Sequence, residues 1–126
     1  MSDPQKQLQA LSDAYTDLQN DLTTLITKRR TLSSQLTEST SVQTTLSPLP
    51  PKNQIYKLVG PVLLKQDKAD ATMSVDARVK FIEGRISEVE TQIADTQAKM
   101  EGVRGEIIQL QSRMEQPQGA GKGVKA

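Results

Sequence analysis

The chain has 126 residues, of which 35% are hydrophobic and 2% aromatic, with one Phe, two Tyr and no Trp, which argues against a conventional globular core. Sixteen Lys and Arg nearly balance fifteen Asp and Glu, giving a net charge of +1. The chain as a whole therefore has no strong electrostatic field that would attract nucleic acid or an anionic membrane. Because cysteine and histidine are absent, disulfides and thiolate or imidazole metal sites are excluded, and no cofactor is expected.

The first residues, MSDPQKQ, lack the basic and apolar regions of a secretory signal. No apolar run approaches the roughly 20 residues that a helix needs to cross a bilayer. We therefore expect a cytoplasmic protein.

The first long segment is predicted to be a helix over residues 4–46. Asp3 and Pro4 suit an N-cap and a first helical position, and the prolines of the linker 47–54 prevent the helix from continuing. A heptad stripe runs through this segment. Its positions are Leu8, Leu11, Tyr15, Leu18, Leu22, Leu25, Arg29, Leu32, Leu36, Ser39, Gln43 and Leu46.

A second stripe predicts another helix over residues 67–115, with Asp67 placed to cap its first amides. The stripe contains Val75, Val79, Ile82, Ile86, Val89, Ile93, Thr96, Met100, Val103, Ile107, Leu110 and Met114. Gly84, Gly102 and Gly105 weaken this helix but fall at outward positions. The glycine-rich tail 116–126 is expected to be disordered.

The two stripes cover nearly equal lengths, 39 and 40 residues, with 28 residues between them in which the chain can reverse. An antiparallel two-helix coiled-coil hairpin is therefore predicted. The alternative is a parallel homodimer, which places the proline-rich break inside a continuous rod and leaves the insertion without a purpose.

The insertion IYKLVGPVLLK, residues 55–65, predicts a β-hairpin, because strand formers surround a glycine–proline turn signal. Apolar side chains point to both of its faces, and the residues that occupy the turn stay open. A lone two-stranded hairpin is marginal in water, with exposed faces and unpaired edges. It either folds back on its own helices or pairs with strands of other subunits, and we favour the second. The assembly residues are then Ile55, Tyr56, Leu58, Val59, Gly60, Pro61, Val62, Leu63 and Leu64.

Residues 53–86, NQIYKLVGPVLLKQDKADATMSVDARVKFIEGRI, resemble the central signature of β-class prefoldin subunits. There a hydrophobic hairpin, Tyr-Lys-Leu-x-Gly-Pro-Val-Leu-x-Lys-Gln, leads into a helix carrying Val-x-x-Arg-x-x-Phe-Ile. The resemblance covers the layout from about residue 4 to 115, and the three helix glycines and the tail depart from it. It implies a mainly α fold whose central β-hairpin joins an inter-subunit β-barrel.

The resemblance also implies a function. This chain is expected to join two α-class and three further β-class subunits in a hexameric co-chaperone that needs no nucleotide and is not an enzyme. Unfolded or nascent chains, such as actin and tubulin, are held at coiled-coil tips and delivered to the cytosolic group II chaperonin. The tip residues are expected to be Leu8, Leu11, Ile107, Ile108, Leu110 and Met114.

Helix ends fray, so seam residues near the termini can contact a non-native chain, and Ile108 lies off the seam altogether. The alternative is that these residues simply complete the coiled coil. The competing function is a structural coiled-coil adaptor that tethers specific folded partners.

Other candidate sites are weak. The basic cluster Lys28, Arg29 and Arg30 lacks a second patch or interleaved aromatics, so a solvated or register-setting role is favoured over nucleic-acid binding. GAGKG, residues 119–123, lacks the context of a phosphate loop. No pair of carboxylates is predicted to lie in a cleft, so acid–base catalysis has no support.

Overall fold

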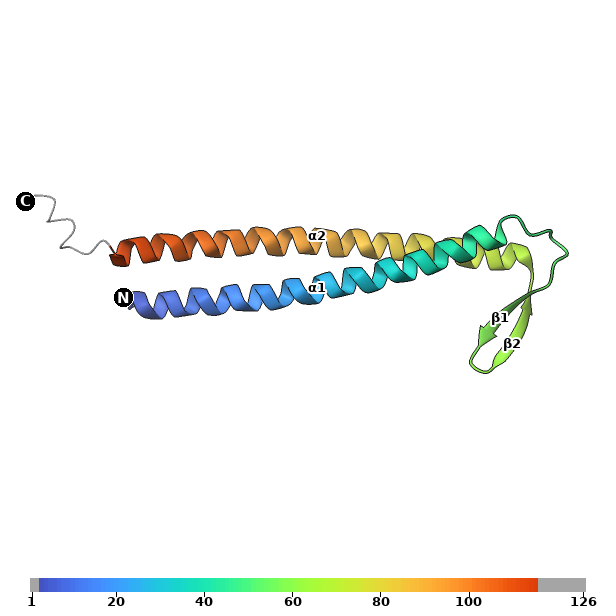
Figure 1. Cartoon of the computed structure of the whole chain (residues 1–126), viewed down its shortest axis with the longest axis horizontal. Coiled ribbons are helices and arrows are strands. Elements are labelled where there is room, and N and C mark those ends of the chain that lie inside the picture. The colour runs from blue at the N-terminus through green and yellow to red at the C-terminus, as the bar shows by residue number, and fades with distance from the viewer. Residues whose placement is uncertain (1–2, 116–126) are drawn as a thin grey trace, which may run out of the picture. The chain divides into compact units, whose positions relative to one another are not determined.

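The computed structural model describes residues 3–115, which form two long helices and one antiparallel hairpin (Figure 1). The elements are α1 (Pro4–Leu46), β1 (Ile55–Val59), β2 (Val62–Gln66) and α2 (Lys68–Glu115). This confirms the mainly α fold with a central β-hairpin. The predicted hairpin ended one residue early, and the second helix begins one residue later than expected. The tail 116–126, predicted to be disordered, lies outside the described residues.

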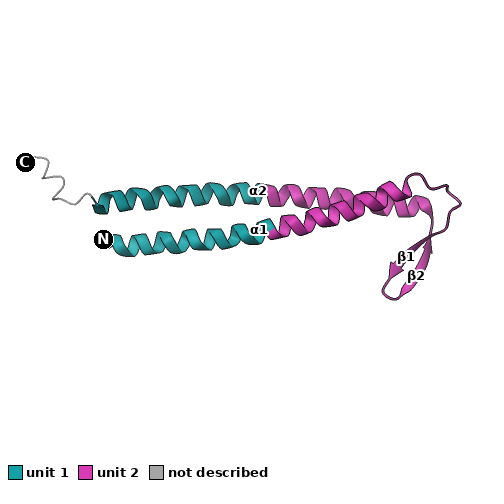
Figure 2. Ribbon diagram, viewed as in Figure 1, with its two compact units in different colours: residues 1–26, 91–126 teal, residues 27–90 magenta. Residues whose placement is uncertain are grey.

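The chain divides into two compact units (Figure 2). Among the described residues, unit 1 comprises residues 3–26 and 91–115, and unit 2 comprises residues 27–90. Each contains a segment of both helices, and unit 2 also contains the hairpin.

The helical segments pair within the chain and run antiparallel in each unit. In unit 1, residues near Leu11 share a groove with residues near Leu110, whereas residues near Leu25 share one with residues near Thr96. In unit 2, the end of α1 lies against the start of α2, and Gln43 hydrogen-bonds to Asp76. The predicted intramolecular coiled coil is therefore present, in place of a parallel homodimer.

An aspartate stands at the N-cap position immediately before each helix. The Asp3 carboxylate accepts a hydrogen bond from the Gln5 amide at 3.1 Å, and Pro4 takes the first helical position, where no amide hydrogen is needed. At the second helix the Asp67 carbonyl accepts the first helical bond from the Ala71 amide at 2.9 Å. Asp67 therefore occupies the N-cap position, which explains why the helix itself begins at Lys68.

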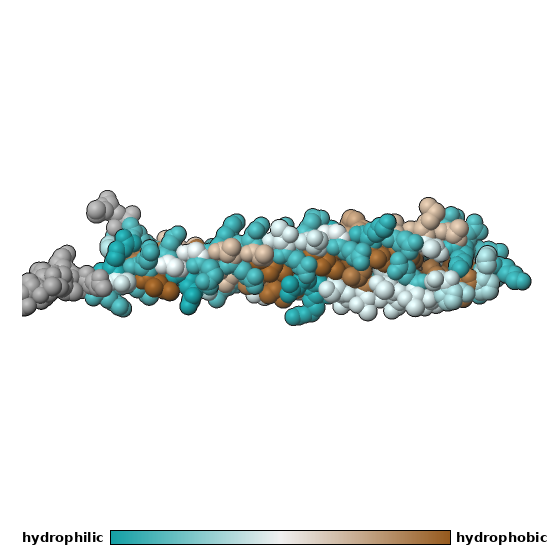
Figure 3. Space-filling model, turned by 90° about the horizontal axis from the view of Figure 1, so that it is seen from above, coloured by the Kyte–Doolittle hydropathy of each residue, from teal (hydrophilic) through white to brown (hydrophobic). Residues whose placement is uncertain are grey.

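The seam follows the predicted stripes, and all twelve predicted positions in each helix are buried or half-buried. The most enclosed apolar side chains lie mainly on α2, including Ile82, Val89 and Ile93 at 3%, 2% and 5% exposure. In the space-filling view, hydrophobic side chains form an interrupted row with hydrophilic ones on both sides (Figure 3). Burying each such side chain contributes about 1.5–3 kcal/mol, so packing stabilises helices that are marginal alone.

Gly102 and Gly105 lie within α2, and a Cβ added at either position meets nothing within 4 Å. We predict that Gly102→Ala and Gly105→Ala each raise the free energy of unfolding by about 1 kcal/mol, because alanine loses less backbone entropy in a helix. Urea unfolding followed by circular dichroism measures the change. The exposed Ala94→Gly provides the reverse control, with an equal loss expected. Unchanged midpoints for both alanine variants would contradict the prediction.

Candidate functional site

Gly60 and Pro61 form the two-residue loop between β1 and β2, since Val59 pairs directly with Val62. Gly60 has φ of 60°, which is costly for residues with a side chain, and the Pro61 ring fixes a negative φ. A positive φ at the first loop residue followed by a negative one matches a type II′ turn, whose twist suits a hairpin. The structure thus identifies the turn residues, which the sequence left open.

The strand register divides the hairpin side chains between two faces, because directly opposed residues point to the same side. One face carries the pairs Tyr56–Lys65 and Leu58–Leu63, and the other carries Ile55–Gln66, Lys57–Leu64 and Val59–Val62. Each face therefore has an apolar cross-strand pair and a lysine. A soluble hairpin packed on a core has one apolar and one polar face, so this pattern indicates a ribbon covered on both sides.

The apolar hairpin side chains are exposed on both faces. Leu58 and Leu63 are 68% and 62% exposed on one face, whereas Val59 and Val62 are 48% and 52% exposed on the other. The hairpin projects to one side of the helical segments of unit 2 (Figure 2). The helices of its own chain therefore leave both faces uncovered.

Both edges of the hairpin also carry backbone groups without strand partners in the described chain. Opposed pairs in an antiparallel ladder alternate between pairs that bond each other and pairs whose backbone groups point outward. Because Val59 and Val62 flank the loop as a bonded pair, the outward groups belong to Tyr56 and Leu58 on β1 and to Leu63 and Lys65 on β2. Pro61 lies in the loop and removes no donor from either edge.

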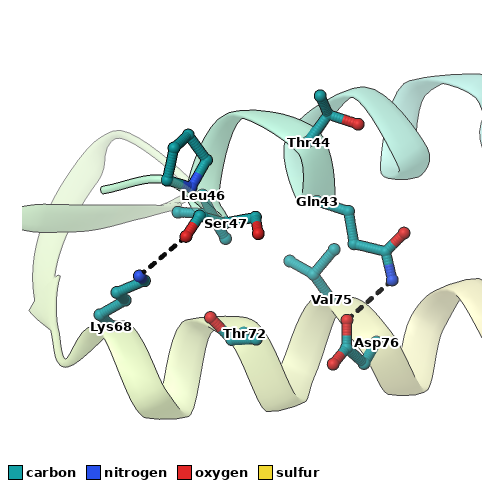
Figure 4. A pocket seen from close by; sticks show the side chains of 9 residues that line it. Gln43, Thr44, Leu46, Ser47, Lys68, Thr72, Val75 and Asp76 are labelled. Atoms are coloured by element: carbon teal, nitrogen blue, oxygen red, sulfur yellow. Dashed lines mark hydrogen bonds between the residues drawn. The ribbon is translucent and has the colours of Figure 1, made fainter. Parts of the chain in front are cut away.

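A polar junction fixes the ends of the insertion that carries the hairpin (Figure 4). Lys68, the first residue of α2, donates from Nζ to the Ser47 carbonyl at 3.1 Å and also to the Leu49 carbonyl. These carbonyls lie just beyond the end of α1, where an ammonium group complements the negative end of the helix dipole. The start of α2 is therefore tied to the end of α1.

Two side-chain bonds continue this junction between the helices. Gln43 Nε2 donates to Asp76 Oδ1 at 2.7 Å, and Arg78 Nε donates to Ser39 Oγ at 3.1 Å. Ser39 is 6% exposed, so its hydroxyl needs such a partner. The polar seam positions at residues 39 and 43 thus have specific partners on α2.

The junction also borders a cavity of about 610 Å³ between Leu46, Lys68 and Val75. Within residues 3–115 no group of three or more His, Cys, Asp and Glu could hold a metal ion. The Lys68 ammonium and the Asp76 carboxylate already bond other groups. These bonds join the end of α1 to the start of α2 on either side of the hairpin.

The predicted tip residues all lie in unit 1, but their exposure differs. Ile108 is 52% exposed, whereas Leu110 is 5% exposed. The remaining four are half-buried, namely Leu8, Leu11, Ile107 and Met114. Leu11 and Leu110 also line a groove of about 340 Å³ between the helix ends. Ile108 is therefore open to a partner in the structure as it stands, while Leu110 becomes accessible only if the helix ends separate.

Sequence patterns predicted the hairpin, and the tip residues stay a prediction, but the residues of the junction were missed. Lys68, Asp76 and Arg78 form the junction, yet each reads as one more charged residue of a helix. The sequence signal for this junction was the presence of two polar residues, Ser39 and Gln43, within a mainly apolar heptad stripe. Met73 and Phe81, exposed at 69% and 68%, were also missed as surface residues. The sequence signal for these two residues was that large apolar side chains occupy positions outside the heptad stripe.

None of the helices among the described residues is long and apolar enough to span a membrane. Arg29 of the basic cluster is half-buried in the seam, as its heptad position predicted, whereas Lys28 and Arg30 are exposed. This distribution agrees with the solvated or register-setting role.

Comparisons with known proteins agree with this layout. The profile of the family described as "Prefoldin subunit" matches residues 9–113. The chain is 36% identical to prefoldin subunit 6 of Homo sapiens over 120 residues, covering 95% of this chain and 93% of the human protein. It is 38% identical to prefoldin subunit 6 of Saccharomyces cerevisiae over 100 residues, covering 79% and 88% of the two chains.

A solved structure supports the same fold. The crystal structure of the prefoldin beta subunit from Thermococcus strain KS-1 matches with a TM-score of 0.77 and 22% sequence identity. The match covers 85% of this chain and 94% of the archaeal one.

Lys68→Ala tests the junction. We predict that it lowers the free energy of unfolding by about 1 kcal/mol, because it removes charge-assisted bonds from a half-buried ammonium to the end of α1. Urea unfolding measures the loss. Lys80→Ala, at an exposed position of the same helix, is the matched control and should change stability by less than about 0.5 kcal/mol. Equal effects of the two variants would mean that the Lys68 bonds add nothing.

Proposed function

The chain belongs to the prefoldin subunit family, and we propose that it acts as a β-class subunit of a hexamer that captures unfolded or nascent polypeptides. Two α-class and three further β-class subunits complete this hexamer in the cytoplasm. It works without ATP and passes clients such as actin and tubulin to the group II chaperonin. The hairpins join in a β-barrel, and the helix ends hold the client.

The exposed hairpin is the observation that carries the proposal. Its apolar cross-strand pairs Leu58–Leu63 and Val59–Val62 face opposite sides, and both edges offer backbone donors and acceptors. A neighbouring strand can satisfy an edge, and a neighbouring face can cover the leucines. Assembly through strands therefore resolves both deficits at once.

Client capture is supported by the surface of unit 1. Ile108 is half-exposed, and beside it a groove of mixed character contains Leu11 and Leu110 together with the polar side chains of residues such as Gln7 and Glu106. Such contacts are few and non-directional, which suits a holder that must release many different chains. Met114, which is half-buried, adds an adaptable side chain.

Leu58→Ser combined with Leu63→Ser tests assembly. We predict at least tenfold weaker assembly with an α-class partner, because each buried leucine contributes about 1.5–3 kcal/mol. Light scattering after size exclusion measures the assembled fraction, and circular dichroism verifies that the helices persist. Lys52→Ser in the exposed linker is the control and should assemble normally. Normal assembly of the double variant would reject the hairpin as the assembly surface.

The reconstituted complex should suppress aggregation of an unrelated denatured protein at near-stoichiometric ratios without ATP. A tether for specific folded partners should fail this light-scattering assay, which separates the two candidate functions.

We further predict that Leu8→Ser, Ile108→Ser and Met114→Ser together weaken capture while the hexamer keeps its size. The matched control replaces exposed Gln97 and Gln111 with serine. Capture unchanged by the triple variant rejects the tip assignment.

A further inference from the structure

A row of apolar and small residues lies on the side of α2 that faces away from α1. Met73, Ala77, Phe81 and Gly84 make up this row, which we call the α2 outer patch, and all four are exposed. They occupy outward heptad positions, whereas the neighbouring seam residues Val79 and Ile82 are 8% and 3% exposed. The coiled coil therefore cannot cover the patch.

The patch contains the only Phe of the chain. Phe81 is 68% exposed and Met73 is 69% exposed, and among the described residues of α2 only Ile108 is a comparably exposed large apolar side chain. A chain with so few aromatics leaves its single phenyl ring in solvent. Grouped exposed apolar side chains of this kind mark contact surfaces.

The position and the charge of the patch indicate what covers it. Met73 and Phe81 belong to unit 2, as the hairpin does, so both are carried by one compact body. Asp70 and Glu88 lie on the same side of α2, one beyond each end of the patch, Lys80 lies beside Phe81, and all three are exposed. An apolar strip with acidic ends and a cation beside its middle fits an apolar partner whose lysines lie near its ends.

The hairpin has this chemistry. On one face Lys65 and Tyr56 lie beside the apolar pair Leu58–Leu63. Its five-residue strands are about 17 Å long at 3.4 Å per residue, and the twelve residues from Met73 to Gly84 span about 18 Å at 1.5 Å per residue. A Cβ added at Gly84 meets nothing within 4 Å, so a neighbouring backbone can approach there.

We propose that the α2 outer patch docks the β-hairpin of a neighbouring prefoldin-family subunit, with Phe81 and Met73 covering one of its apolar faces. The proposal rests on the proposed function, because it assigns a helical contact to the same assembly. Strand pairing in a closed barrel satisfies the hairpin edges and covers the inner face of the hairpin, but leaves its outer face open. The patch supplies a cover for that outer face.

Photo-crosslinking tests this contact directly. The chain lacks cysteine, so Phe81→Cys provides a single thiol for a benzophenone maleimide before reconstitution with the sister subunits. We expect crosslinks to the hairpin peptide of another subunit, identified by mass spectrometry, at several times the yield from Gln97→Cys, an exposed position of α2 in unit 1. Crosslinks that stay within this chain, that reach only an added unfolded client, or that do not exceed the control would overturn the proposal.

Met73→Ser combined with Phe81→Ser provides a second test. Both side chains are exposed, so helical content should stay unchanged, while assembly with the sister subunits should weaken about tenfold. Val42→Ser, which removes a 45% exposed apolar side chain from α1, is the control and should assemble normally. If the wild-type complex forms and suppresses aggregation while the double variant assembles equally well, only the docking contact is rejected. If the wild-type chain forms no complex, the proposed function fails as well.

Discussion

A two-stranded ribbon cannot cover both of its faces or pair both of its edges, and this constraint governs the rest of the molecule. In this chain the ribbon carries apolar pairs on opposite faces, at Leu58–Leu63 and Val59–Val62, and all four side chains are exposed. If only one face of the ribbon were packed against a core, the apolar pair on the opposite face would still be exposed to solvent. The chain's own two helices are occupied with each other along the seam. The surplus apolar surface therefore calls for other chains, in agreement with membership of a family of subunits.

The apolar seam stabilises the two helices, whereas the polar junction specifies how they align. Apolar seam packing stabilises the coiled coil, but a uniform stripe of leucine and valine leaves its register weakly specified. The buried Ser39 hydroxyl with its Arg78 partner, and Gln43 with Asp76, favour one register, because a shift leaves polar groups unpaired. Lys68 then ties the start of α2 to the carbonyls beyond α1. The junction therefore fixes where the hairpin leaves the helices, and a ribbon that must meet neighbours benefits from a defined starting point.

The fold was largely predictable because its signals are local and periodic. Every position predicted from the heptad spacing is buried or half-buried, although the buried Ala71 lies before the predicted stripe of α2. The prolines after Leu46 ended α1, and the glycine–proline pair marked the turn. The polar junction was not predictable, because residues such as Asp76 and Arg78 have ordinary helical surroundings and acquire partners only when the helices align. The exposure of Phe81, in contrast, could have been predicted, because this residue lies outside the heptad stripe. Local propensity was also overruled: the segment TESTSVQTTL at the end of α1 is rich in poor helix formers, yet it is helical. There Thr40 and Thr44 bond back to carbonyls of their own helix at 2.7 and 3.0 Å, and seam packing offsets the remaining cost.

The exposed apolar residues fall into two groups that belong to different compact units. The hairpin and the α2 outer patch lie in unit 2, whereas Ile108 and the groove beside Leu110 lie in unit 1. Because these groups lie in different compact units, changes in one should add to changes in the other with little coupling. Their required strengths differ as well. An assembly surface must bury enough apolar area to persist, whereas a surface that holds and releases clients must stay weak. Under the proposed function, their placement in separate units allows the helix ends to vary toward different clients while the assembly surfaces stay unchanged.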